Sequence, residues 1–222
     1  MTTATLTTPP QTQTPPPAAA AAPPAAVEEP PFGGLAALRR FTVDEYHQML
    51  KAGILYEGEP VELLEGLVVT KMPRGPDHEH AIRTLNYRLV RMLPDGWVVG
   101  PQTAATLTDS EPEPDFTVAR GEEAAFADRH PGPADIALLI EVSDSSLRRD
   151  TRDKGRIYAR AGVPVYWIVS IPDRRVDVLT DPSGPADAPA YATRTEYPHG
   201  AAVPVVLDGV TVGTITVADV IR

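Results

Sequence analysis

The stretch 134–142 reads ADIALLIEV and is almost continuously apolar. A strand with one buried face alternates apolar and polar residues, whereas a strand covered on both faces is apolar throughout. The run therefore predicts a central strand with a layer of structure on each side of its sheet. Glu141, near the end of that run, would have little access to water. A buried carboxylate needs a metal ion, a cation or several donors, so Glu141 is the first candidate functional residue.

Helices and strands alternate irregularly along the rest of the ordered chain. Helices are predicted over 42–52, 77–93 and 150–161, the first from a capping box of Thr42 and Glu45. Strands are predicted over 61–64, 67–70, 97–99, 104–107, 115–118, 134–142, 165–169 and 175–180, with further short strands after residue 190. This order predicts an α/β chain of the mixed α+β kind, with helices flanking a mixed sheet.

The composition divides the chain into three parts. Residues 1–32 are rich in Pro, Ala and Thr and nearly uncharged, which predicts a disordered tail. Residues 33–181 are expected to form the core, and 182–222 a β-rich C-terminal extension packed on it. The whole chain has 222 residues, which suffices for one sizeable core.

Charge and composition exclude several classes of protein. A net charge of −10 argues against binding nucleic acid through a broad basic face. The absence of cysteine excludes disulfides and thiolate metal ligands, and fits a cytoplasmic protein. No signal peptide and no apolar stretch of about 18 residues is present, so no membrane association is expected.

A second carboxylate is expected beside Glu141. The connection between strands 115–118 and 134–142 is short for a crossover helix, so antiparallel pairing is the simpler arrangement. Asp115 starts the first strand and Glu141 lies near the end of the second, which makes them neighbours. Two such carboxylates repel unless a cation lies between them, and Mg²⁺ (or Mn²⁺) suits two oxygen ligands with bound water.

The helix predicted after residue 150 contributes a buried cation. Arginines recur at every fourth position and form one basic stripe: Arg148, Arg152, Arg156 and Arg160. Lys154 lies roughly opposite this stripe, on the core-facing side that also carries Tyr158. A lysine that faces the sheet can neutralise Glu141 or the charge that develops on a phosphorane.

These residues lie in motifs that resemble a known family. The segments EPEPD at 111–115, EVSDSS at 141–146 and YARAGVP at 158–164 are similar to those of the Uma2 (DUF820) family, over about residues 40–180. That family belongs to the PD-(D/E)XK nuclease superfamily with a restriction-endonuclease-like fold. The resemblance implies a Mg²⁺- or Mn²⁺-dependent endonuclease that hydrolyses DNA phosphodiester bonds. A homodimer would suit cleavage of both strands.

The resemblance also implies residue roles. Asp115, Glu141 and the backbone carbonyl of Val142 would bind the metal, and Lys154 would stabilise the nucleophile or the transition state. The superfamily usually places its lysine where this chain has Ser143, so Lys154 would replace it from the following helix.

Three further residues are weaker candidates. Glu62 resembles an early acidic residue of the family and is a further metal-ligand candidate, and His78 resembles its helix-start histidine. Tyr158, one helical turn after Lys154, is the third.

Simpler interpretations exist for each residue. Glu141 and Lys154 can form a purely structural ion pair, and Asp115 can be a turn residue at a strand start. Glu62 and the arginine stripe fit solvated faces, and His78 fits a helix cap. At the level of function, the alternative is a catalytically inactive nucleic-acid-binding or regulatory module on the same fold. A two-carboxylate glycoside hydrolase would need an aromatic-lined cleft, which 6% aromatic residues do not favour.

Overall fold

The structure is a computed structural model that describes Met1, residues 38–56 and residues 58–222. The chain divides into Met1–Leu38 and a compact unit, Arg39–Arg222. The predicted tail 1–32 lies outside the described residues, apart from Met1. Within the described part, no helix has both the length and the apolar character needed to cross a bilayer.

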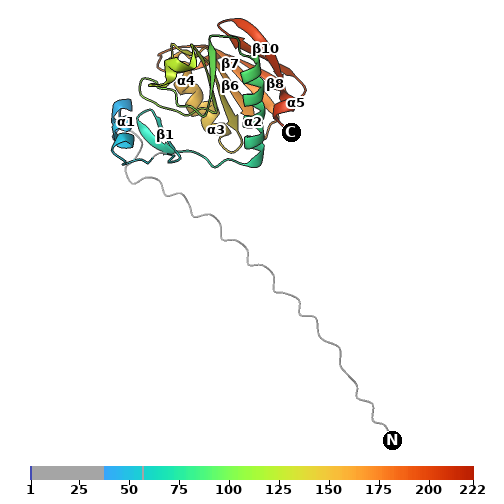
Figure 1. Ribbon diagram of the computed structural model, residues 1–222, viewed down its shortest axis with the longest axis horizontal. Helices are drawn as coiled ribbons and strands as arrows, with labels where there is room; N and C mark the ends of the chain where they lie inside the picture. Colours follow the sequence, from blue (N-terminus) through green and yellow to red (C-terminus); the bar gives the residue numbers. More distant parts are fainter. Residues whose placement is uncertain (2–37, 57) are drawn as a thin grey trace. The chain divides into compact units, whose positions relative to one another are not determined.

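A mixed six-stranded sheet forms the centre of the compact unit (Figure 1). Its spatial order is β3 (Trp97–Pro101), β4 (Phe116–Arg120), β5 (Ile136–Ser143), β6 (Val165–Ser170), β7 (Arg175–Pro182) and β8 (Tyr191–Pro198). β5 runs antiparallel to β4 and parallel to β6. The antiparallel pairing predicted for the strands of Asp115 and Glu141 is therefore confirmed, as is the mixed sheet.

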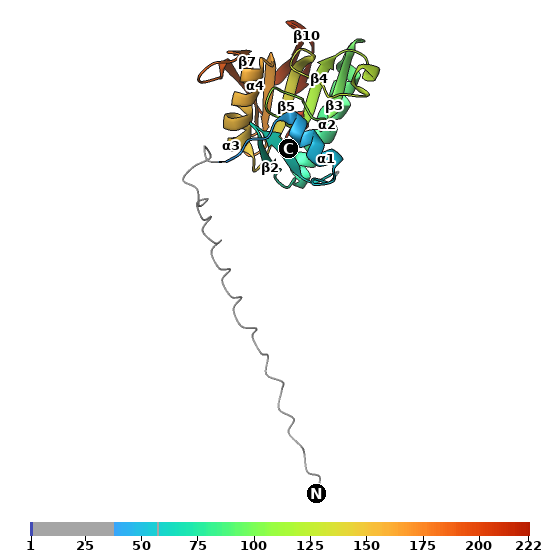
Figure 2. The ribbon, with the colours of Figure 1, turned by 90° about the vertical axis from the view of Figure 1, so that its left-hand side faces the viewer.

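Every residue of β5 is buried, as the uninterrupted apolar run predicted. From Leu138 onward its apolar side chains alternate between two cores. Leu138 and Ile140 pack with α2 (Pro76–Met92), while Leu139 packs in the second core with Tyr158. The views in Figures 1 and 2 show α2 on one side of the sheet and α4 (Gly155–Ala161) on the other.

The helix after β5 begins three residues earlier than predicted. It starts with α3 (Leu147–Arg149), passes through a π-helical turn at Asp150–Lys154 and continues as α4. Gly162 ends it in the left-handed conformation with φ of 76°, as a helix-terminating glycine does. The π-helical turn leaves no signal in the spacing of apolar residues, so the sequence did not predict it.

A small hairpin precedes the sheet in sequence. It consists of β1 (Val61–Leu64) and β2 (Leu67–Thr70), after the capped helix α1 (Val43–Lys51). Gly66 in its turn has φ of 76°, and a Cβ there would lie 2.6 Å from Cβ of Arg40. The turn therefore requires glycine for both its conformation and its close approach to the preceding chain.

The segment 104–107, predicted as a strand, is not one. Its amides at Ala105 and Leu107 donate to the carbonyls of Pro112 and Ser110, so it folds back on the loop before β4 instead of joining the sheet. Ala105 and Leu107 are nevertheless buried, which explains the strand-like apolar pattern.

The segment 182–222, expected as a C-terminal extension, contributes to the same unit. It supplies the edge strand β8, the hairpin β9 (Ala202–Leu207) and β10 (Val210–Thr216), and α5 (Val217–Val220). Val203, Val205 and Ile215 of the hairpin lie in the core beside α2.

Glu65 ties the β1–β2 turn to α4. Its carboxylate accepts hydrogen bonds from Arg156 at 2.6 Å and from Arg160 at 2.7 Å. Burial alone would raise the pKa of Glu65, but the two guanidinium groups outweigh it and hold that pKa below its ordinary value. The charged form of Glu65 is therefore favoured by folding.

Replacing Glu65 with Gln should lower the free energy of unfolding by about 1 kcal/mol at neutral pH, because a charged, doubly bonded acceptor becomes neutral. A depressed carboxyl pKa stabilises the fold above the unfolded pKa, and this is lost as pH falls through the folded pKa. In urea unfolding, the difference between wild type and E65Q should therefore begin to shrink below about pH 4 and become steadily smaller at lower pH.

The matched control is Glu79→Gln, which removes the exposed ion pair with Arg83. It should change stability by only about 0.3 kcal/mol. A stability difference for E65Q that stays constant down to about pH 3 would contradict the ion-pair account.

Candidate active site

Asp115 and Glu141 lie side by side at one edge of the β4–β5 ladder. The last ladder pair is Phe116 with Ile140, so the next step outward places Asp115 opposite Glu141. Residues opposite each other on neighbouring strands project from the same face of a sheet. Both carboxylates are nearly enclosed, with exposed fractions of 4% and 5%. The structure thus brings together the two residues that strand direction alone placed as neighbours.

Pro114 explains why the ladder stops at this point. One step beyond Asp115, Val142 would face Pro114, and proline has no N–H to donate. The Val142 N–H donates instead to Oδ2 of Asp115, at 2.8 Å. Because the N–H and C=O of a strand residue point to the same side, the Val142 carbonyl also points toward Asp115 and has no ladder donor from Pro114. A backbone oxygen therefore lies on the side of β5 that carries Asp115.

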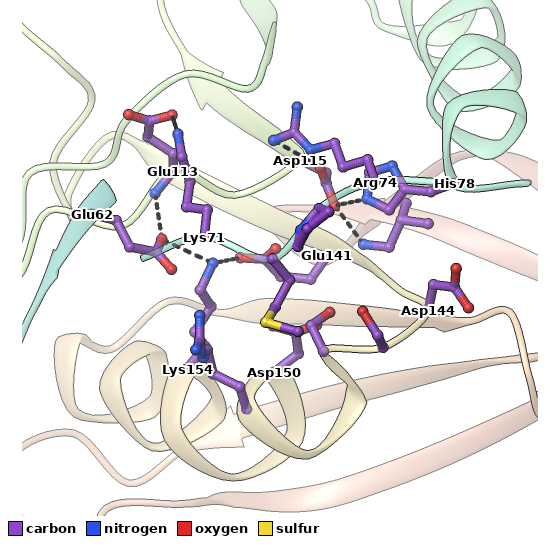
Figure 3. A pocket seen from close by; sticks show the side chains of 16 residues that line it. Glu62, Lys71, Arg74, His78, Glu113, Asp115, Glu141, Asp144, Asp150 and Lys154 are labelled. Atoms are coloured by element: carbon purple, nitrogen blue, oxygen red, sulfur yellow. Dashed lines mark hydrogen bonds and ion pairs between the residues drawn. The ribbon is translucent and has the colours of Figure 1, made fainter. Parts of the chain in front are cut away.

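Lys154 lies on the other side of Glu141 (Figure 3). Its Nζ is 2.8 Å from Oε1 of Glu141 and 3.0 Å from Oε2 of Glu62, and its exposed fraction is 5%. The hydroxyl of Tyr158 donates to the same Glu141 Oε1 at 2.8 Å. The core-facing orientation that the helical phase predicted for Lys154 is therefore observed, and Tyr158 joins it one turn later.

This cluster holds more buried carboxylates than buried ammonium groups. Burial lowers the pKa of Lys154, but the carboxylates of Glu141, Glu62 and Asp150 outweigh it, so the pKa lies above its ordinary value and the ammonium stays protonated. Burial raises the pKa of Glu141 well above its ordinary value, and Lys154 offsets this only in part, while Asp150, Asp115 and Glu62 raise it further. An additional cation at this point would therefore be stabilising.

Asp150 is a buried member of the cluster that was not among the predicted site residues. The hydroxyls of Ser143 and Ser146 both donate to its Oδ2, at 2.6 and 2.5 Å. Its backbone carbonyl accepts a hydrogen bond from the Tyr166 hydroxyl at 3.0 Å. These bonds fix the start of the π-helical turn that ends at Lys154. Ser143 thus helps to anchor the helix that supplies Lys154.

Asp115 also contacts the first turn of α2, through His78, and the chain just before it, through Arg74. Nε2 of His78 is 3.2 Å from Oδ2 of Asp115, and Arg74 lies 3.9 Å from Oδ1. His78 makes no capping hydrogen bond, because Gly75 is the N-cap residue and Pro76 opens the helix. The helix-cap interpretation of His78 is therefore wrong. Arg74 has no distinctive sequence pattern around it, which is why the sequence did not identify it.

An open cavity is lined by the charged residues of the site, namely Glu62, Arg74, His78, Asp115, Glu141, Asp150 and Lys154 (Figure 3). Within the described residues, no group of three or more His, Asp or Glu side chains forms a ready-made metal cage. The hydrogen bonds of the described chain use Oδ2 of Asp115 and Oε1 of Glu141. They leave Oε2 of Glu141 and Oδ1 of Asp115, the latter with only the ion pair to Arg74 at 3.9 Å. Two carboxylate oxygens, a carbonyl and several waters fit Mg²⁺ or Mn²⁺.

The environment of Glu62 differs from that of Asp115 and Glu141. Its Oε2 faces Lys154 and accepts the N–H of Glu113 at 3.2 Å. The carboxylate of Glu113 in turn pairs with Lys71. Glu62 is thus placed to hold Lys154, and its assignment as a metal ligand stays a prediction.

Comparisons with known proteins agree with this architecture. No curated protein matches the chain. A solved structure from Anabaena variabilis ATCC 29413, described as "a putative nuclease belonging to DUF820", is similar with a TM-score of 0.56 at 18% identity, over 81% of this chain and 97% of the other. At that identity the likeness establishes a shared fold. Residues 43–215 match Uma2, a family described as "Putative restriction endonuclease". The chain therefore belongs to the Uma2 family.

Proposed function

We propose that this protein is a divalent-metal-dependent endonuclease that hydrolyses phosphodiester bonds in DNA. The observation that carries the proposal is the adjacent pair Asp115 and Glu141, held at a strand edge with protonated Lys154 in contact with Glu141. The description of the Uma2 family and that of the Anabaena structure support the same class of activity.

Each residue would have a distinct part in the reaction. Asp115, Glu141 and the Val142 carbonyl would hold Mg²⁺ or Mn²⁺, which when bound supplies charge neutralisation and a water of lowered pKa. Lys154 would donate hydrogen bonds from its ammonium group to the phosphoryl oxygens as negative charge develops there. Tyr158 would keep Oε1 of Glu141 turned toward the helix, which leaves Oε2 for the metal.

The alternative is a non-catalytic nucleic-acid-binding or regulatory module. The observation that favours it is the direct contact of Lys154 with both Glu141 and Glu62, which neutralises part of the cluster without any metal. The net charge of −10 agrees with it as well. The two functions differ in metal binding and in cleavage, so both can be measured.

Asp115→Asn and Glu141→Gln should each reduce plasmid cleavage in Mg²⁺ or Mn²⁺ by about 100-fold or more, because each removes a charged metal ligand while keeping the side-chain shape. The measurement is the initial rate of nicking and linearisation. Asp219→Asn, which removes an exposed carboxylate paired with Arg88, is the matched control and should cleave like wild type. Wild-type rates in both site variants would disprove the assignment.

Lys154→Met should lower the free energy of unfolding by about 3–5 kcal/mol, because it leaves Glu141 and Glu62 buried without their cation. Millimolar Mg²⁺ should restore part of this loss, since the ion would neutralise Glu141 directly. Denaturant unfolding with and without Mg²⁺ measures both effects. If Mg²⁺ restores nothing, the cluster is the structural ion pair of the alternative function.

A further inference from the structure

The four arginines of the predicted basic stripe fall into two groups. Arg156 and Arg160 are committed to the fold, since both bind Glu65 and Arg160 also binds Asp109 at 2.7 Å. Arg148 and Arg152 differ from this pair. The side chain of Arg152 is 74% exposed and lies 3.9 Å from Asp153, and Arg148 is exposed with no ion pair in the part of the chain that the structure describes.

The second group borders a hollow that shares lining residues with the active-site cavity. This hollow is lined by Met72, Ser145, Ser146, Arg148, Arg149, Arg152 and Asp153. Four of these also line the active-site cavity: Met72, Ser145, Ser146 and Arg149. Arg149 spans the gap, because its guanidinium donates to the carbonyl of Thr70 at the end of β2, at 2.8 Å. The two hollows are therefore neighbours on the surface, with Arg149 at their boundary.

The charge of this path suits an anion. The phosphate backbone of a nucleic acid that approaches the active site is repelled by the carboxylates there and by the net charge of −10. Arg148, Arg149 and Arg152 bring three guanidinium groups to the adjoining hollow, against the single carboxylate of Asp153 in its lining. Guanidinium groups bind phosphate oxygens with several donors at once, and side chains four residues apart lie about 6 Å apart along a helix.

We propose that Arg148 and Arg152, with Arg149 between the two hollows, form the surface that binds the phosphate backbone next to the scissile bond. The proposal rests on the proposed function and makes it more specific. It assigns DNA binding to half of the stripe and a structural role to the other half. The ligand chemistry is the phosphodiester backbone itself, which DNA and RNA share.

The test compares the double variant R148Q/R152Q with the double variant R83Q/R91Q. Arg83 and Arg91 lie on α2 and line neither hollow, so the control carries the same change of charge. The probe is a fluorescently labelled DNA duplex of about 20 base pairs, titrated with the full chain in EDTA at several salt concentrations, which separates binding from cleavage. An RNA duplex of the same length and sequence forms the second arm.

R148Q/R152Q should weaken DNA binding about 10-fold or more and lower the slope of log K against log salt by about 2, because two phosphate contacts are lost. R83Q/R91Q should bind like wild type. Equal binding by wild type and R148Q/R152Q, equal losses in both double variants, or no binding by wild type at low salt would each overturn the proposal. Binding of RNA but not DNA would reassign the ligand and contradict the surface as a DNA site.

The outcome is distinguishable from failure of the proposed function. If the enzyme assignment is wrong, wild type shows no cleavage in Mg²⁺ or Mn²⁺ while the binding difference between the two double variants persists. If the surface assignment alone is wrong, cleavage by R148Q/R152Q keeps the wild-type KM for the duplex.

Discussion

The site depends on one ammonium group buried between carboxylates. Lys154 contacts Glu141 and Glu62 at hydrogen-bond distance, and its side chain is almost fully enclosed. Removing either kind of partner from such a cluster leaves a buried charge without compensation, which costs several kcal/mol. Lys154 therefore helps to hold its helix against β5. The hydroxyls bound to Asp150 and the Tyr158 hydroxyl bound to Glu141 belong to the same docking arrangement.

The remainder of the site follows from the end of one ladder. Pro114 has no N–H, so pairing between β4 and β5 stops where Val142 would otherwise continue it. Asp115 takes the Val142 N–H in its place, and the Val142 carbonyl is left on the same side. A proline followed by aspartate at a strand start thus creates a carboxylate, a backbone oxygen and a gap in the sheet edge together. Glu141 faces that gap from the neighbouring strand.

The sequence was sufficient to predict those parts of the fold that depend on hydrophobic periodicity and on strand direction. The apolar run around Glu141 predicted the central strand, and the short connection before it predicted antiparallel pairing. The position of Lys154 in the helical repeat predicted that its side chain faces the sheet. Contacts between distant segments could not be predicted in this way. The bonds of Asp150 to Ser143 and Ser146 depend on a π-helical turn that no apolar pattern encodes.

The basic stripe is a second case in which contacts between distant segments could not be predicted from the sequence. Four equally spaced arginines look equivalent in sequence, yet two of them bind Glu65, a turn residue about 90 positions earlier in the chain. The strand predicted over 104–107 was wrong for a related reason. The loop folds against the core, so its buried apolar residues give the same sequence pattern as a strand. In both cases tertiary contacts decided the outcome and local pattern did not.

The most direct test of the central claim is titration calorimetry of Mn²⁺ into the purified chain, with D115N/E141Q as the comparison. If Asp115 and Glu141 form the metal site, wild type should bind Mn²⁺ with a stoichiometry of at least about one, and the double variant should lose that binding. Binding of Mn²⁺ by D115N/E141Q with wild-type affinity, or no binding by wild type, would contradict the account.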